Sequence, residues 1–575
     1  MKKKICAFWF LLSGLFGFAQ SPVFEWARGI SSDSLKPAEP ASIALDMAGN
    51  VYTTGYFGGT VDFDPGPGIY NLSTSSASQV FILKLDALGN FIWAKSFDGW
   101  GSSMGRSITV DGTGNIYTTG SYHGQIDFDP DTSVFYLNYL YGGSSLFISK
   151  LDPLGNFVWI KNAAGDSAGV QPASITTDGL GNIYTTGYFS GMADFDPDTT
   201  VQNLTAAGES DIFILKLHTD GSLDWVRGMG GPGYDQANSV TVDSSQNVYM
   251  TGSFSGTADF NPFGTPCILS SSGGSDSFIS KLDSSGDFLW AKGIGDVYFD
   301  FGNSVVSDHT GNVYSVGFFV GNVDFDPGPD STILTSAGCG APYILKLDSA
   351  GNFVWVKSEI SSTTFKATSI ALDASDYPYI TGYFDGTVDS DLDSGIYYLS
   401  GASDLFILKL NPSGNFVWAR SMGGPGYESG NAIVVDAANN IYTVGDFSGT
   451  VDFDPGAGTV DVASQPGAIT SCFIHKMSEA ITTGTGDPVS PERLIIYPNP
   501  SPGVCYINAP DLSANYSIEV YNCLGACVYK SFVTEAQTGI DLSGQPDGIY
   551  FIKVICDNTV TFQKLIRHKL AMQHI

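Results

Sequence analysis

A tryptophan followed two residues later by lysine or arginine recurs seven times along the chain at a nearly constant interval. The motif occurs at Trp26, Trp93, Trp159, Trp225, Trp290, Trp355 and Trp418. A period of roughly 65 residues is typical of repeat architectures, in which each unit is one supersecondary element. Most of the chain must therefore fold as seven copies of one unit.

Each unit contains four strand-like pieces, called a, b, c and d here, which are clearest in residues 107–161. Pieces a (107–111) and b (116–122) are joined by one short turn, and pieces c (146–152) and d (157–161) by another. A long Gly-rich excursion separates b from c. Both turns read D-x-x-G-N, in which Asp bonds its own backbone and Gly and Asn tolerate positive φ. The a–b and c–d pairs are therefore predicted hairpins.

The pattern predicts an all-β fold. In piece d, Phe157 and Trp159 face one way and Val158 the other, so we expect both apolar faces to be covered, as in radially packed four-stranded blades. A lone d piece surrounds Trp26, and the last repeat stops after its c piece (472–477). We predict a seven-bladed β-propeller over residues 20–477, closed by the N-terminal strand completing the last blade, which removes free sheet edges.

The repeated unit, "DGTGNIYTTGSYHGQIDFDP" followed by "LFISKLDPLGNFVWIK", resembles the bacterial SBBP β-propeller repeat. The resemblance covers residues 23–478. It implies the fold, and it implies no particular activity.

The start of the chain and its charge bear on location and partners. Residues 1–19 combine Lys2, Lys3 and Lys4 with an apolar run to Phe18, which predicts a secretory signal peptide cleaved after Ala19. No later stretch is apolar enough for a membrane-spanning helix. The net charge is −32, with 26 basic against 58 acidic residues. Nucleic acid is a poor partner for such a chain, because its binding depends on Lys and Arg.

A D-x-D pair recurs between pieces b and c. Residues two apart in an extended segment point the same way, so the two carboxylates repel unless a cation holds them. Calcium, which binds six to eight oxygens, is one candidate cofactor. The candidate calcium ligands are Asp62, Asp64, Asp127, Asp129, Asp194, Asp196, Asp324, Asp326, Asp452 and Asp454; two units depart, with Asp259/Asn261 and Asp389/Asp391.

Lysine and arginine are the alternative cations, and we prefer this hypothesis. Bases at one fixed position in piece c and one in piece d account for 14 of the 26 basic residues. A partly buried charge needs a partner. We expect a base to lie against the first aspartate of the D-x-D pair or against the aspartate that ends piece a. The second aspartate would then form a turn, which fits its replacement by Asn261. The bases are Lys84, Lys150, Lys216, Lys281, Lys346, Lys409 and Lys476 in piece c, and Arg28, Lys95, Lys161, Arg227, Lys292, Lys357 and Arg420 in piece d.

Other catalytic signals are absent from the sequence. The six histidines share no metal-ligand spacing, and no nucleophile elbow, phosphate loop or H-E-x-x-H motif occurs. Cys267 and Cys339 lie in excursions of neighbouring units, and we expect them to be unpaired.

Residues 478–493 read as a linker, and residues 494–575 as a small β-sandwich. The latter resembles the type A C-terminal sorting domain of the type IX secretion system. The resemblance implies recognition by that machinery and then release or attachment at the outer-membrane surface. The matching residues are Pro498, Asn499, Pro500, Gly503, Gly525, Asp541, Gly548, Tyr550 and Lys564.

We expect a protein exported through the periplasm that acts as a binding or adhesion platform and is not an enzyme. Its long b–c excursions would present a polysaccharide or protein ligand site on a rigid scaffold. A metal-assisted hydrolase or lyase with a site at the propeller channel is one alternative. A purely structural surface protein is the other.

Overall fold

The computed structural model divides into two compact units, the repeat domain (Pro22–Glu479) and a C-terminal unit. It describes residues 22–479, apart from 33–35, 132, 141–142, 164, 166–168, 199, 337–339, 360–363, 394, 457 and 466. Of the C-terminal unit it describes 495–497, 504–508, 516–522, 527–533, 537–546, 548–556 and 559–567. The predicted signal peptide and the predicted linker after Glu479 lie outside these residues.

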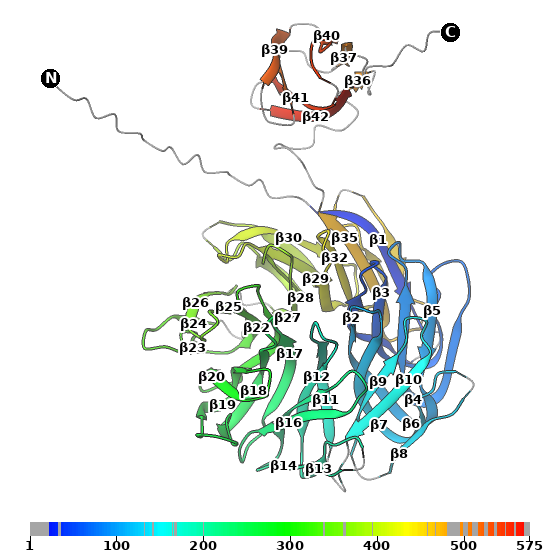
Figure 1. Ribbon diagram of the computed structural model, residues 1–575, viewed down its shortest axis with the longest axis vertical. Helices are drawn as coiled ribbons and strands as arrows, with labels where there is room; N and C mark the ends of the chain where they lie inside the picture. The colour runs from blue at the N-terminus through cyan, green and yellow to red at the C-terminus, as the bar shows by residue number, and fades with distance from the viewer. Residues whose placement is uncertain are drawn as a thin grey trace, which may run out of the picture. The chain divides into compact units, whose positions relative to one another are not determined.

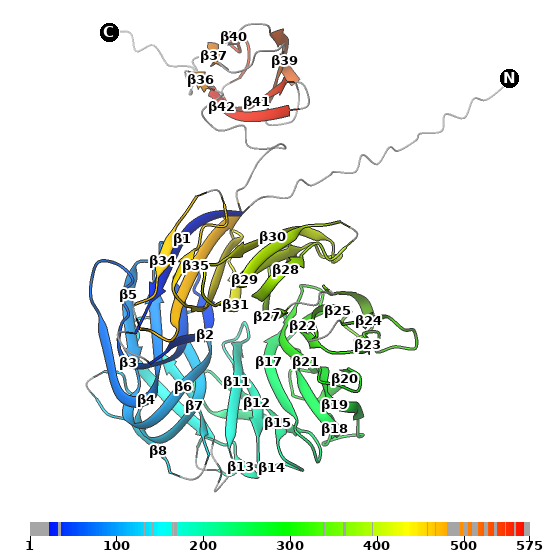
Figure 2. The same ribbon diagram turned by 180° about the vertical axis from the view of Figure 1, so that it is seen from behind.

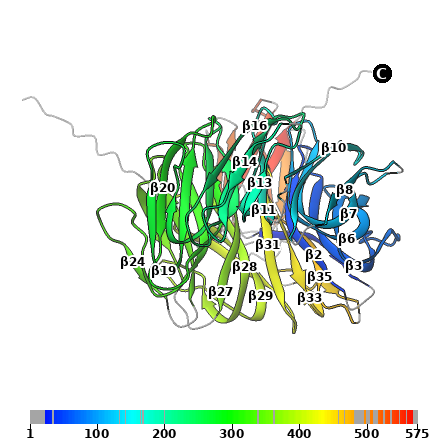
Figure 3. The same cartoon turned by 90° about the horizontal axis from the view of Figure 1, so that it is seen from below.

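The repeat domain is all-β. Within its described residues, seven antiparallel sheets have four or five strands. In each, four strands lie across the sheet in chain order, apart from the last sheet, and the fifth strand of the second sheet lies off this path. The sheets follow one another around a common centre (Figures 1 and 2). Seen from below, strands of successive sheets stand side by side (Figure 3).

The strands of these sheets correspond to the a, b, c and d pieces. The first sheet contains β2 (Ala38–Leu45), β3 (Val51–Asp62), β4 (Asn71–Leu85) and β5 (Phe91–Ser96). The second contains β6 (Asp98–Val110), β7 (Ile116–Asp127), β9 (Ser145–Leu151) and β10 (Phe157–Ala163), with β8 (Tyr136–Tyr139) beside β7. The third contains β11 (Val170–Thr177), β12 (Ile183–Phe189), β15 (Asp211–Leu217) and β16 (Leu223–Met229), and the fourth β17 (Gln236–Val242), β18 (Val248–Asp259), β19 (Ile268–Leu282) and β20 (Phe288–Ile294).

The fifth sheet contains β21 (Phe301–Ser307), β22 (Val313–Phe319), β25 (Ala341–Leu347) and β26 (Phe353–Lys357), and the sixth β27 (Phe365–Leu372), β28 (Pro378–Asp389), β29 (Tyr398–Leu410) and β30 (Phe416–Met422). The last contains β31 (Glu428–Val435), β32 (Asn440–Phe447), β35 (Ser471–Glu479) and β1 (Pro22–Ile30). Small two-stranded sheets are formed by β13 (Met192–Asp194) with β14 (Asn203–Thr205), β23 (Asn322–Asp324) with β24 (Ile333–Thr335), and β33 (Thr450–Asp452) with β34 (Asp461–Ala463).

The first strand of the domain pairs with its last. Strand β1 runs antiparallel to β35, with Ala27 opposite His475 and Ile30 opposite Cys472. The a strands of successive sheets contact one another from β2 through β6, β11, β17, β21 and β27 to β31, and β31 in turn contacts β2. The series of contacts therefore returns to its starting strand.

The c-strand lysines link successive sheets. Six of them donate from Nζ to a backbone carbonyl in the c–d turn of the next sheet, and the seventh donates to a carboxylate. The bonds run from Lys84 to Pro153, Lys150 to Thr219, Lys216 to Ser284, Lys281 to Ser349, Lys346 to Pro412 and Lys476 to Ala87, at 2.9–3.3 Å. In the last sheet β35 ends at Glu479, and there Lys409 bonds the Glu479 carboxylate at 2.7 Å.

The sequence expectation that both faces of piece d are covered is wrong for its outward face. Val158 is 44% exposed, and the equivalent Ile92, Leu289 and Val354 are exposed to a similar extent. The d strand lies at the outer edge of each sheet, where one face has no neighbouring sheet. The inward tryptophans pack beneath a turn glycine of the next sheet, as Trp225 does beneath Gly286.

The C-terminal unit contains two sheets that share one core. One sheet has the order β36 (Ile495–Tyr497), β37 (Val504–Asn508), β40 (Gln537–Asp541), and the other β39 (Cys527–Val533), β38 (Tyr516–Asn522), β41 (Gly548–Cys556), β42 (Thr559–Arg567). Cys505 and Ile540 from the first sheet meet Ile518, Val520 and Ile552 from the second. Among the described residues of the whole chain, no helix has the length and hydropathy to span a membrane.

Candidate functional site

The first aspartate of each D-x-D pair is held by backbone amides of its own loop. Asp62 Oδ1 accepts hydrogen bonds from the N–H groups of Asp64 (3.1 Å) and Tyr70 (2.8 Å). The same two bonds, from the residues two and eight positions later, occur in the other six units. No base within the described residues forms an ion pair with a first aspartate, so this half of the base hypothesis is wrong.

The second aspartate closes a tight turn. Asp64 Oδ1 accepts the Gly66 N–H at 2.8 Å, and in the departing unit Asn261 Nδ2 donates to the Thr265 carbonyl at 2.8 Å. Amides therefore satisfy one oxygen of each carboxylate in the Asp62/Asp64 pair. In the described part of the chain, no three His, Cys, Asp or Glu side chains are grouped to hold a metal. Calcium binding by the pairs stays a prediction.

The aspartates that end the a strands are the ones that the c-strand lysines approach. Lys346 Nζ lies 3.5 Å from Asp308 Oδ2, and Lys409 Nζ lies 3.6 Å from Asp373 Oδ2. The base hypothesis is confirmed at these two positions. These two lysines also lie over tyrosine rings, as does Lys84 in the first sheet, whose Nζ is 4.9 Å from the ring centre of Tyr52.

Each of these aspartates also organises its turn. Asp46 Oδ1 accepts the N–H groups of Ala48 and Asn50, while Oδ2 accepts Asn50 Nδ2 and the Tyr52 hydroxyl at 2.7 and 2.9 Å. Burial alone would raise the pKa of the Asp46 carboxyl, but these hydrogen bonds outweigh it and hold the pKa below its ordinary value. The carboxylates are engaged in structural bonds and are poor candidates for general acids.

The d-strand bases have partners that the sequence analysis missed. Lys95 pairs with Asp131 at 2.7 Å, and Lys161 pairs with Asp198 at 2.6 Å. Lys357 forms the same pair with Asp393. Each of these aspartates follows the D-x-D pair by two residues and belongs to the next sheet. The D-x-D-x-D spacing in three of the units was the available signal.

A cavity of about 390 Å³ lies against the a–b turns of four successive sheets. Its lining includes Asp243, Asp308 and Asp436, each bound to its own turn. His309 Nδ1 lies 2.7 Å from Asp376 Oδ1, and this contact raises the pKa of His309. The histidine is thus an exposed turn residue.

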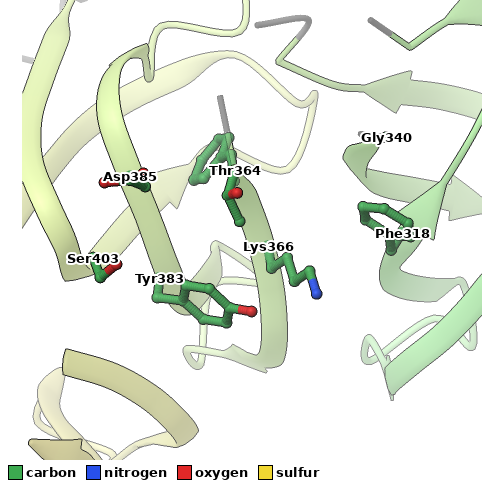
Figure 4. Close-up of a pocket in the computed structure, with 8 residues that line it drawn as sticks. Phe318, Gly340, Thr364, Lys366, Tyr383, Asp385 and Ser403 are labelled. Carbon is green, nitrogen blue, oxygen red and sulfur yellow. The ribbon is translucent and has the colours of Figure 1, made fainter. Parts of the chain in front are cut away.

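A second cavity, of about 350 Å³, lies between the fifth and sixth sheets and departs from the repeat (Figure 4). Phe318 of β22 forms one wall. Lys366 of β27 and Tyr383 of β28, which are opposite each other in the register, form another. Asp385 also lines the cavity, with Thr364 and Ser403.

Lys366 lies between the two aromatic walls. Its Nζ is 5.5 Å from the ring centre of Phe318 and 5.8 Å from that of Tyr383. Within the described residues it makes no hydrogen bond or ion pair. Sequence analysis did not single out this lysine, because it stands outside both repeated base positions.

The remaining predicted residues fall in several places. Cys267 is a free thiol, and Cys339 lies outside the described residues. In the C-terminal unit, Tyr550 is buried and its hydroxyl donates to the Pro546 carbonyl, Asp541 Oδ1 accepts the Ser543 N–H, and Gly548 and Lys564 lie in paired strands. Pro498, Asn499, Pro500, Gly503 and Gly525 lie outside the described residues.

Two family models match the chain. The secretion system C-terminal sorting domain matches residues 495–568, and the β-propeller repeat SBBP matches residues 158–191 and 224–260. The chain therefore carries SBBP β-propeller repeats and a type IX secretion sorting domain, which indicates secretion or anchoring at the outer-membrane surface.

More distant similarities add little on function. An uncharacterized WD repeat-containing protein of Acanthamoeba polyphaga mimivirus is 23% identical over 515 residues, covering 75% of this chain and 36% of the relative. The chain thus spans about a third of that relative. A Dyadobacter fermentans protein of unknown function aligns over 80% of this chain and 99% of its own at 9% identity, with a TM-score of 0.34. The extracellular domain of a putative hybrid two component system of B. thetaiotaomicron aligns over 94% and 100% at 11% identity, with a TM-score of 0.16.

Proposed function

Because the chain carries β-propeller repeats and a type IX secretion sorting domain, we propose that it is an exported binding or adhesion protein built on a closed seven-bladed propeller, and that it is not an enzyme. Secretion machinery would recognise the C-terminal unit. The repeat domain would then meet a polysaccharide or protein ligand outside the cell.

Seven blades in a closed ring are supported by bonds that repeat across the two ends of the domain. Asn238 Nδ2 donates to the Gly302 carbonyl of the next sheet at 2.8 Å, and Asn431 Nδ2 donates in the same way to Pro40 at 2.9 Å. The second bond joins the last sheet to the first. The Lys476 bond to Ala87 does the same on the c strands. Closure of this kind removes exposed sheet edges.

The binding role rests on one observation, the cavity around Lys366. Bound ligands favour concave sites with aromatic walls and a few polar groups that fix orientation. The cavity departs from the repeat, because no other sheet has a base at the register of Lys366. A lysine that has no hydrogen bond or ion pair within the described residues contributes nothing evident to the fold, whereas its position between two aromatic rings offers a ligand one charge and two flat surfaces.

The test is an array experiment with the fluorescently labelled full chain on polysaccharides, glycoproteins and whole bacterial cells, with product analysis of the bound material. We expect saturable binding with no bond cleavage. Cleavage of a bound polymer would favour the hydrolase or lyase alternative. A blank result on every surface would favour a purely structural protein.

A further inference from the structure

The position of Lys366 in the repeat makes it unusual. The a-strand residue at this register lies opposite a b-strand residue in every sheet, next to the junction with the preceding sheet. Its equivalents are Glu39, Met104, Gln171, Gln236, Phe301 and Ser429. Only the sixth sheet places a base there. The chain carries 26 bases against 58 acids, so an additional lysine outside the repeated base positions is a notable departure.

The other lysines of the repeat show what a structural lysine does in this fold. Each c-strand lysine donates to a turn carbonyl or a carboxylate within hydrogen-bond distance. Lys366 is partly buried, and within the described residues its ammonium contacts ring faces only. The aromatic rings attract the ammonium group, but they satisfy none of its three N–H donors.

The aromatic wall is held in place by its surroundings. Gly340 has φ +98°, and a Cβ built there would lie 2.1 Å from the Phe318 ring, so only glycine lets this ring keep its position. On the other side, the Tyr383 ring packs edge-on against Tyr427 of the next sheet, with 5.8 Å between ring centres. The two flat surfaces are thus positioned before any ligand arrives.

The polar groups of the cavity are divided by charge. Lys366 points toward Phe318, whereas Asp385 lies on the other side of Thr364 (Figure 4). Asp385 would repel a second negative charge, and one lysine neutralises one anionic group. The hydroxyls of Thr364, Tyr383 and Ser403 suit a ligand that carries several hydroxyls of its own. The volume of about 350 Å³ lies near the lower end of the range for small-ligand sites, roughly 300–1,000 Å³.

These features of the cavity are complementary to a ligand with apolar ring faces, several hydroxyls and a single carboxylate. We propose that the Lys366 cavity binds one uronic acid unit of an acidic polysaccharide, with its carboxylate on the Lys366 ammonium and its C–H faces against Phe318 and Tyr383. Asp385 accepts hydrogen bonds from sugar hydroxyls in this arrangement. The inference rests on the proposed binding function and names its ligand.

The experiment is calorimetric titration of the full chain with trigalacturonate and with its methyl ester, which keeps the sugar and removes the charge. We expect the ester to bind at least tenfold more weakly. Lys366→Met keeps the aliphatic stem against the rings and removes the ammonium, and it should weaken trigalacturonate binding at least tenfold. Lys36→Met is the matched control, because Lys36 also stands outside the repeated positions and, within the described residues, bonds only the Ser76 carbonyl. It should bind as the natural protein does.

Melting temperatures of both variants separate loss of binding from loss of folding. Equal affinities for acid and ester, or unchanged affinity in a folded Lys366→Met variant, would overturn the uronate assignment. No binding of trigalacturonate would overturn it too; if the array still finds another ligand, the broader binding proposal survives, and if the array is blank both fall.

Discussion

Pairs of buried carboxyl groups meet between three pairs of neighbouring sheets, and they should make the stability of the repeat domain depend on pH. Asp276 and Asp300 are 4% and 1% exposed. Asp300 accepts the N–H groups of Val320 and Asp296, and Asp276 Oδ2 accepts that of Ser272, but Asp276 Oδ1 has no hydrogen-bond partner. The other pairs are Asp211 with Asp235, both buried, and the half-buried Asp404 with the buried Glu428.

Equivalent positions at other junctions indicate what the acid pair lacks. Between the first and second sheets the same two positions hold Gln79 and Ser103, and the Ser103 hydroxyl donates to Gln79 Oε1 at 2.8 Å. Between the fifth and sixth they hold Ala341 and Phe365, both buried and apolar. In the Gln79/Ser103 pair the serine hydroxyl supplies the proton of the hydrogen bond. The Ala341/Phe365 pair has no polar side-chain group that needs one. Two ionised carboxylates have no donor between them, so the Asp276/Asp300 pair needs a proton of its own.

The sign and size follow from the pKa values. Burial raises the pKa of Asp276 to about 7, with a further contribution from Asp300 and Asp296, and burial raises the pKa of Asp300 to about 6. The folded pKa of Asp276 thus exceeds its unfolded value, and the folded protein holds the extra proton. Stability from this group is fully present below about pH 4, falls as the pH rises toward 7, and is lost above it. The whole shift corresponds to roughly 4 kcal/mol, and we expect roughly 2–4.

The perturbation is Asp276→Asn, which places an amide donor where the proton would be. Unfolding entropy of about 2.1 cal/mol/K per residue means that, for a domain of this length, 1 kcal/mol moves the melting temperature by roughly 1 °C. We therefore expect the variant to melt roughly 2–4 °C above the natural protein at pH 8 and at the same temperature at pH 4. Asp330→Asn, at an exposed site, removes the same charge and should show no such change. A difference that is independent of pH, or a less stable variant at pH 8, would refute the reasoning.

Three further outcomes are expected from thermal melts of the full chain. EDTA should shift the melting temperature by less than about 1 °C, because backbone amides already hold the paired aspartates; a fall reversed by calcium and not by magnesium would instead make the pairs a calcium site. Lys409→Met leaves the buried Glu479 carboxylate without its ion pair and should lower the free energy of unfolding by roughly 3–5 kcal/mol. Adding Glu479→Gln should restore part of that loss, and additive losses would contradict the pairing. Gly286→Ala should destabilise by at least about 1 kcal/mol, because φ is +75° and a Cβ would lie 2.8 Å from Trp225, whereas Gly179→Ala, with open space and ordinary φ, should change stability little.

The local structure was accessible from the sequence because each unit repeats its own chemistry. The D-x-x-G-N turns fix both hairpins, and the structure places their fourth residue at positive φ even where it is Gln246 or Asp376. Asn261 correctly indicated that the second aspartate forms a turn. Strand pairing follows from such local signals, since hairpin register is set by turn type.

Contacts between units were harder to predict, because their partners lie in neighbouring repeats and differ from sheet to sheet. Asp131, Asp198 and Asp393 were missed as partners of d-strand lysines for this reason. The acid pairs were also missed, although a spacing of 24 residues between acids in three of the units carried the signal. A side chain at a junction between two sheets has to fit only its partner across that junction, so these residues vary among the repeats although the strand pattern is the same in each.

This variation among the repeats offers a way to locate a binding site in a repeat protein of this kind. Once every residue explained by the repeat is set aside, the bases left in residues 22–479 are Lys36, Arg106 and Lys366. Lys36 bonds a backbone carbonyl, and Arg106 is exposed and contacts the Met104 sulfur at 3.9 Å. Lys366 alone of these faces a cavity with aromatic walls. A ligand site requires different groups in different roles, which an identical repeat does not supply, so the position that departs from the repeat without serving the fold is where binding is best sought.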